Sequence, residues 1–196
     1  MAEEIKLRPK VVLRRKQEPV EFTFDGLLKV ICTWNEGGVS SDLDLCMFYR
    51  TKDGQDGGVF SSGFRQRKDD LGHLDKFPYM EHKGDMRTDH SNPDAKEQVN
   101  VSNLNEIDTA YVCVLAYDAA IDGESIGFNG CNGRVELMTD SGDYLEVPID
   151  TPNEGVVYHV CSIKNAGGKN SVFNVGDVLS LGEAYDKIPG FKLLVE

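Results

Sequence analysis

The sequence lacks several features that would mark common classes of protein. No apolar run approaches the roughly 18 residues of a membrane-spanning helix, so we do not expect an integral membrane protein. The opening MAEEIKLRPK is followed by no apolar signal segment, which favours a cytoplasmic location. The chain also lacks a GxxxxGK[ST] phosphate loop and a GxGxxG motif, the usual signatures of nucleotide binding.

Basic charge is scarce. The 196 residues include 21 Lys and Arg against 33 Asp and Glu, a net charge of −12. Nucleic acid is therefore not expected as a partner, because little positive charge is present to neutralise phosphates. Residues 1–18 are the exception, with six basic and three acidic side chains. This basic arm is either a solvated first strand or a weak contact with an anionic membrane surface or an acidic partner.

Paired cysteine motifs are absent. The number of cysteines is odd, five, and no two of them have CxxC spacing. We therefore predict free, buried thiols in a reducing compartment, and no zinc site. The cysteines are Cys32, Cys46, Cys113, Cys131 and Cys161.

Alternation of apolar and polar residues is the main pattern in the chain. Many short β-branched or aromatic segments alternate with period two, which is typical of strands with one face buried. TDSGD (139–143) and KNAGGKN (164–170) each join two such segments and predict hairpins. The expected strands are 20–24, 28–34, 43–49, 59–63, 98–102, 110–118, 134–139, 143–149, 156–163 and 171–175.

Helical signals are few. Residues 103–108 are compatible with one helical turn, and a capping-box pattern at 180–183 predicts a short helix that ends at Lys187. The pattern as a whole predicts an all-β fold: a β-sandwich of two mainly antiparallel sheets with long acidic loops and little helix. We expect an N-terminal arm over 1–10 and a single domain over 11–196.

The segment from Arg65 to Glu97 breaks the alternation. It is long and polar, and such a loop in a small domain is usually functional or disordered. The apolar cluster FPYM (77–80) favours an ordered loop. Its oxygen-bearing side chains include Asp85, Asp89, Asp94 and Glu97.

Two aspartates open the expected strand over 43–49. Asp42 and Asp44 lie on one strand face, about 6.6 Å apart along the chain. Their charges repel by roughly 2–3 kcal/mol at an effective dielectric of 20. Water, an arginine or a divalent cation would each offset this repulsion. Calcium takes six to eight oxygen ligands, which the pair, the acidic loop and the Asn35 side chain together offer.

Several segments in order resemble one known family. They are Trp34-Asn35 with SDLDLCMFY, then FPYMEHKGDMRTD, then VNVSNLNEIDTAYVCVLAYDA, and finally GEAYDKIPGF. Their order and spacing resemble the tellurium-resistance (Ter) stress-protein family, in its TerD-like domain, and more closely its TerA-type branch. The likeness runs from about Val11 to Phe191.

The resemblance implies a non-enzymatic, calcium-binding stress-response protein with a β-sandwich fold. The family's acidic positions match Asp42, Asp44 and Asp85, and its later acidic cluster matches Asp94 and Glu97 approximately. Asp89 stands where the family has a glycine. The implied partners are other tellurite-resistance and stress proteins in a membrane-linked assembly.

Three other readings stay open. The first is a metal-independent sandwich that binds a partner protein or small ligand through its loops. The second is an enzyme that uses clustered carboxylates as acid and base, which requires two acids with divergent pKa values in a pocket. The third is direct transformation of tellurite by an exposed, activated thiol.

Overall fold

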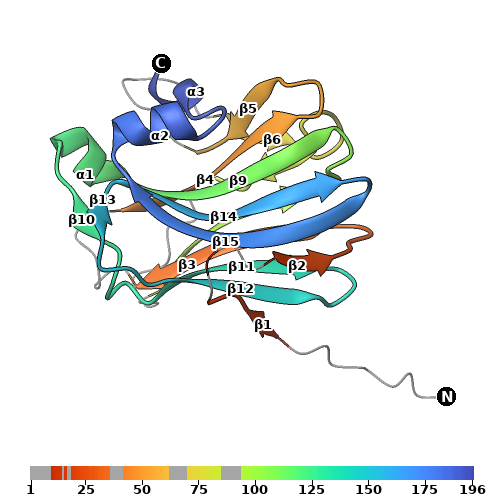
Figure 1. Cartoon of the computed structure of the whole chain (residues 1–196), viewed down its shortest axis with the longest axis horizontal. Coiled ribbons are helices and arrows are strands. Elements are labelled where there is room, and N and C mark those ends of the chain that lie inside the picture. Colours follow the sequence, from red (N-terminus) through yellow and green to blue (C-terminus); the bar gives the residue numbers. More distant parts are fainter. Residues whose placement is uncertain (1–9, 15, 17–18, 36–41, 62–69, 85–93) are drawn as a thin grey trace.

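Two β-sheets lie face to face in this protein, with short helices at one side (Figure 1). The computed structural model describes residues 10–14, 16, 19–35, 42–61, 70–84 and 94–196, and of Asp94 only the backbone. This arrangement confirms the predicted all-β sandwich of mainly antiparallel sheets. Within the described residues, no helix has the length and apolarity needed to cross a membrane.

One sheet has seven strands in the order β1-β12-β11-β3-β8-β7-β6. Its strands pair antiparallel, except that β1 runs parallel to β12. The turn at 139–143 joins β11 to β12, which confirms the first predicted hairpin. The strands are β1 Val11–Val12, β3 Leu28–Asn35, β6 Gly72–His73, β7 Met80–His82, β8 Asp94–Val101, β11 Gly133–Thr139 and β12 Tyr144–Ile149.

The other sheet has six strands in the order β2-β15-β14-β9-β4-β5, all antiparallel. The second predicted hairpin is confirmed between β14 and β15. A small pair, β10 Ile126–Gly127 with β13 Glu154–Gly155, lies beside the sandwich. The six strands are β2 Pro19–Phe22, β4 Leu43–Thr51, β5 Asp56–Val59, β9 Ile107–Ala116, β14 Val157–Ala166 and β15 Lys169–Leu179.

The three helices are short: α1 Tyr117–Asp122, α2 Leu181–Lys187 and α3 Lys192–Val195. The predicted capping box is confirmed at α2. The Ser180 hydroxyl accepts a hydrogen bond from Glu183 N, and the Glu183 carboxylate accepts one from Ser180 N. Helices α2 and α3 lie on the side of the six-stranded sheet that faces away from the other sheet (Figure 1).

Strand β4 is buried on both faces, because each face meets a different layer. Its side chains alternate between the two faces of the sheet. The Tyr49 ring meets Phe77, beside β7 of the opposite sheet, with ring centroids 5.6 Å apart. The Phe48 ring instead meets Phe191, at the start of α3, at 5.4 Å. Leu45 therefore shares the inner face with Tyr49, whereas Asp44 and Cys46 share the helix-covered face with Phe48.

Some element predictions are wrong. A single hydrogen-bonded turn is present within 103–108, where Ile107 N donates to Leu104 O at 3.1 Å, but no helix follows because Ile107 and Asp108 already belong to β9. Tyr117 and Asp118, expected to end a strand, begin α1 instead. The strand expected over 59–63 lies earlier, as β5 at Asp56–Val59.

The long loop expected over 65–97 is partly strand. Its described residues include β6, β7 and the first residues of β8, so this part of the chain extends the seven-stranded sheet. Asp94 and Glu97 accordingly lie in a strand rather than in a loop.

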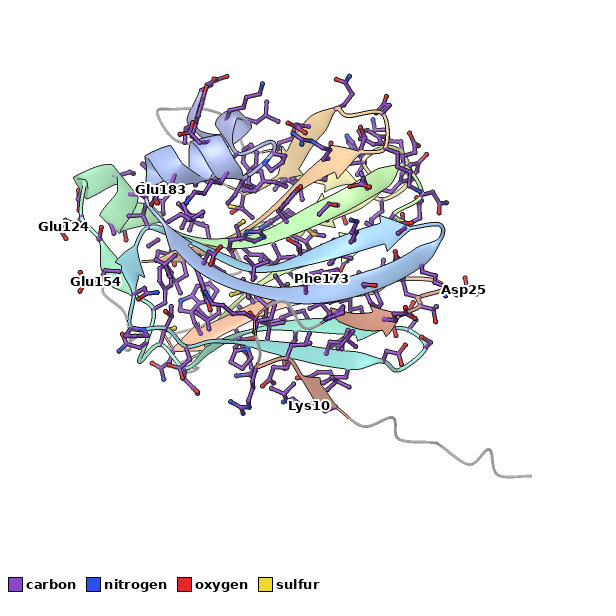
Figure 2. All side chains as sticks on the ribbon, viewed as in Figure 1. Lys10, Asp25, Glu124, Glu154, Phe173 and Glu183 are labelled. Carbon is purple, nitrogen blue, oxygen red and sulfur yellow. The ribbon has the colours of Figure 1, made fainter. Side chains whose placement is uncertain are left out.

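The interior is packed with apolar side chains from both sheets (Figure 2). All five cysteines are free and buried, as predicted. Burial is the largest cause that raises the pKa of each thiol. None of them is therefore the exposed, activated thiol that direct chemistry on tellurite would require.

Candidate functional site

The residues predicted to bind metal come from strands that meet at one end of the sandwich. Strand β3 ends at Asn35, and Asn35 pairs with Asp94, the first residue of β8. Strand β4 of the other sheet begins at Leu43, directly after Asp42. The antiparallel β3–β8 pairing and a contact between β4 and β8 bring these strand ends together.

A buried carboxylate links the two sheets at this end. Glu97, in β8, is 2% exposed, and its Oε2 accepts a hydrogen bond from Leu45 N of β4 at 2.5 Å. The neighbour β5 pairs only with residues 47–50 of β4, so it does not reach Leu45. Glu97 thus satisfies a backbone donor that this stretch of β4 would otherwise bury without a partner.

His82 binds the other backbone group of the same residue. It lies in β7 at 2% exposure, and its Nε2 is 2.8 Å from Leu45 O. Gly84 N donates to His82 Nδ1 at 3.0 Å, so Nδ1 is an acceptor and the proton belongs on Nε2. His82 Nε2 is also 3.7 Å from Glu97 Oε2. Histidine and glutamate together hold the unpaired edge of β4 against the opposite sheet.

Asp42 and Asp44 differ sharply in environment. Asp42 is exposed, and its backbone holds the start of α1: Tyr117 N donates to Asp42 O at 3.1 Å. Asp42 N donates to the Asp118 carboxylate at 3.3 Å. Asp44 is 7% exposed, on the helix-covered face of β4. The predicted pair is therefore one solvated and one buried carboxylate, and Asp118 is a third acid near them.

Besides burial, the carboxylates at this end raise the pKa values of the neighbouring thiols. Burial is the main cause that raises the pKa of Cys46, and Asp44 and Glu97 both raise it further. Burial likewise raises the pKa of Cys32, with Glu97 as the next cause. Cys32 pairs with Glu97 across β3 and β8. The carboxylates of Asp44 and Glu97, from opposite sheets, thus both lie within electrostatic reach of Cys46.

The predicted ligand set is only partly described by the structure. Asp85 and Asp89 lie outside the described residues, as does the Asp94 side chain. Asn35, Asp42, Asp44 and Glu97 are described and lie at one end of the sandwich. Within the described residues, which omit 36–41 and 85–93, no three His, Cys, Asp or Glu side chains form a metal-binding group.

Sequence reasoning missed His82 and Asp118. His82 lies in the segment that was expected to be a polar loop, yet it belongs to β7 and hydrogen-bonds Leu45. The three residues of β7 show no alternation that could have indicated a strand. Asp118 was taken as part of a strand, although the following Ala119-Ala120 favours helix.

Comparison with protein-family models found no match for this chain, and comparison with curated proteins found none either.

Proposed function

We propose that this protein is a non-enzymatic, calcium-binding stress-response module of the tellurite-resistance type. In this proposal it acts in the cytoplasm as a docking surface for other stress proteins in a membrane-linked assembly. Calcium orders one end of the sandwich and thereby forms that surface.

One observation supports the proposal above the others. Asn35, Asp42, Asp44 and Glu97 come from three strands or their ends in two sheets, yet they lie at the same end of the sandwich. The segments 36–41 and 85–93, which connect these strands in the sequence, carry further oxygen-bearing side chains, including Asp85 and Asp89. A hard divalent cation is the partner that such a set of oxygens suits best.

The residues would have unequal roles. Asp42, Asp44 and Asp85 would supply carboxylate oxygens, and Asn35, Asp89 and Asp94 would complete the shell. Glu97 Oε2 already accepts from Leu45 N, so Glu97 would mainly hold β4 in place beside the ion. The ion supplies positive charge that offsets the repulsion between these carboxylates.

Thermal unfolding with calcium and with a chelator tests the proposal. An ion that binds only the folded state stabilises it by about 2.7 kcal/mol at a hundredfold excess over Kd. We expect calcium to raise the melting temperature of the wild type, and Asp42→Asn with Asp44→Asn to remove that rise.

The control replaces two exposed aspartates at the other end, Asp25→Asn with Asp75→Asn, which matches the change in net charge (Figure 2 labels Asp25). This variant should keep the full calcium response. Equal melting temperatures with calcium and with chelator in the wild type would refute the proposal.

One observation favours a second candidate, a metal-independent interaction module. Leu45 N and O are both bound by protein side chains, so the link between the sheets at this end needs no ion. Binding of a partner protein or small ligand that is unchanged by chelation would support this candidate instead.

A further inference from the structure

Leu13, a described residue between β1 and β2, contacts both sheets. Leu13, at 2% exposure, is fixed at both backbone groups. Its N–H donates to Glu146 O of β12 at 2.8 Å, and its carbonyl accepts from Asn174 Nδ2 of β15 at 2.7 Å. The next residues, Arg14 and Lys16, therefore lie over the gap between β12 and β15.

A polar cavity of about 200 Å³ opens beside Arg14 and Lys16. Its wall combines both sheets: residues that follow β12 form one side, and side chains of β14 and β15 form the other. The lining residues used below are Arg14, Asp150, Thr151, Tyr158, Asn174 and Gly176. None of them belongs to the candidate calcium site.

Two largely buried side chains in this wall present polar atoms to the cavity. Tyr158 is 4% exposed and its ring packs on Phe128, with centroids 5.4 Å apart. Its hydroxyl has no hydrogen-bond partner among the described residues. Asn174 is 7% exposed, and its Nδ2 binds Leu13 O, whereas its Oδ1 has no partner in that part of the chain. Both atoms are accessible from the cavity, so water or a ligand can bind them there.

The ionisation state of Tyr158 fixes its role. Burial, followed by the Asp150 carboxylate, raises the pKa of Tyr158 to about 12. The phenol is therefore protonated at neutral pH and acts as a hydrogen-bond donor. Asn174 Oδ1 is an acceptor, so the cavity offers one buried donor and one buried acceptor.

A glycine keeps the space beside these two groups open. Gly176 has a φ of +65°, which disfavours any residue with a side chain. A Cβ at this position would lie 3.2 Å from Lys16 Cε, 3.3 Å from Asn174 Oδ1 and 3.5 Å from the Tyr158 hydroxyl. An alanine here would fill the part of the cavity that both groups face.

The cavity carries charges of both signs. Lys16 is neutralised by Asp177, with Nζ 3.2 Å from Oδ1. Arg14 has no ion-pair partner within the described ranges, so its guanidinium is available to an anion. Asp150 supplies a carboxylate to the same cavity. Arg14 and Asp150 are both exposed, so their charges are solvated at the mouth of the cavity. A simple anion would meet Asp150 unfavourably, and a neutral polyol would use neither charge.

We propose that this cavity binds a small zwitterion of the free amino-acid class. Arg14 and the Tyr158 hydroxyl donate to its carboxylate, and Asp150 and Asn174 Oδ1 accept from its ammonium group. The space corresponds to several water molecules, which suits a compact molecule such as alanine or serine. This inference does not depend on calcium.

Calorimetric titration of the full chain in the presence of chelator tests the inference. Alanine and serine should bind, whereas propionate, which lacks the amine, and ethylammonium, which lacks the carboxylate, should bind at least about tenfold more weakly. No heat with alanine or serine up to tens of millimolar would overturn the proposal. Equal binding of propionate or of glycerol would overturn it as well, because the site would then recognise only an anion or a polyol.

Matched variants locate the binding. Tyr158→Phe removes a hydrogen bond to the carboxylate of the ligand, and Asp150→Asn removes the negative charge that attracts its ammonium group. Each change should weaken alanine binding by about tenfold. Tyr185→Phe and Asp186→Asn, the same changes in α2, should leave binding unchanged. Gly176→Ala should abolish it. Binding that survives both Tyr158→Phe and Asp150→Asn in folded protein would show that the amino acid binds elsewhere.

Discussion

Leu45 is one of the described residues at which hydrogen bonds join the two sheets. Its N–H donates to Glu97 and its carbonyl is bound by His82, in a region that β5 does not cover. A buried backbone group without a partner costs about 1–3 kcal/mol, so these two side chains stabilise the fold beyond any part in metal binding.

Substitution of Glu97 separates these roles. Glu97→Ala leaves Leu45 N buried without an acceptor, and we expect a loss of about 1–3 kcal/mol in the free energy of unfolding. Glu97→Gln keeps an oxygen that accepts from Leu45 N and should retain more of this stability. Urea unfolding in chelator measures both variants. A glutamine variant as unstable as the alanine variant would show that charge, rather than the hydrogen bond, holds β4.

The lowered pKa of His159 predicts that the free energy of unfolding depends on pH. Burial is the main cause that lowers the pKa of His159 from 6.5 to about 4, and Asp177 opposes it. Between these values the unfolded chain binds a proton that the folded chain does not, so stability falls as the pH drops from about 6.5 towards 4. The loss reaches at most about 3 kcal/mol.

His159→Gln should show a smaller decline over the same range, because the glutamine does not titrate. In the wild type, His159 Nε2 lies 2.9 Å from Ser162 Oγ, and the amide of the glutamine can still reach this hydroxyl. Urea unfolding of both proteins at pH 7 and pH 5 gives the comparison. Parallel profiles would mean that other groups cause the acid sensitivity.

Single residues could be predicted from sequence where their own neighbours decide their environment. The five cysteines were predicted to be buried because most of them lie in apolar, alternating segments. The partners of Glu97 and His82 could not be predicted, since Leu45 is 52 and 37 residues away from them. The position of Asp44 on the helix-covered face likewise depends on where the C-terminal helices pack.

Strands and helices could be predicted from the sequence where the turn or cap residues were characteristic and the segments were long enough to show a period. The glycine-containing turns at 139–143 and 164–170 predicted both hairpins, and the capping box predicted α2 up to Lys187. Strands β6 and β7 were missed, because two or three residues show no recognisable period. Helix α1 was missed because an apolar strand runs directly into it.

Gly190, between α2 and α3, lies very close to the six-stranded sheet. Gly190 has a φ of +87°, and a Cβ on it would lie 2.2 Å from Gly57 O of β5. Gly190→Ala should therefore combine backbone strain with a clash that no side-chain movement relieves. We expect a loss of about 1–3 kcal/mol and faster hydrogen exchange in α2 and α3.

Gly182→Ala is the matched control. Gly182 lies in α2, and a Cβ there meets nothing within 4 Å. Alanine at this position should stabilise the helix by about 0.5–1 kcal/mol. Equal stability of the two variants would argue that the packing of Gly190 on β5 contributes little.

The whole molecule depends on pairings that local patterns do not specify. Period-two segments predicted a sandwich, but not that β3 would pair with both β11 and β8, or that β1 would run parallel to β12. These neighbours are distant in sequence, so only packing of the complete sheets selects them. The end of the sandwich that carries the candidate calcium ligands is a product of this long-range order.

The net charge of −12 offers a different explanation for any stabilisation by calcium, one that involves the charge of the whole molecule and no specific site. Any salt screens repulsion among excess carboxylates and stabilises the folded state, without a specific site. At about 0.1 M KCl the Debye length is already about 10 Å, and about 1 mM CaCl₂ barely changes it. A rise in melting temperature under these conditions must therefore come from bound ions rather than from screening.

Melting temperatures measured with additional KCl, and separately with about 1 mM calcium at fixed KCl, therefore distinguish screening from binding. We expect additional KCl to stabilise the wild type and the Asp42→Asn, Asp44→Asn variant by similar amounts, since a change of two charges alters the total only slightly. Calcium at about 1 mM should stabilise the wild type alone, and magnesium should do so less, because it demands a tighter octahedral shell. If calcium and magnesium stabilised both proteins equally, the acidic end would be a diffuse field of charge and not a coordination site.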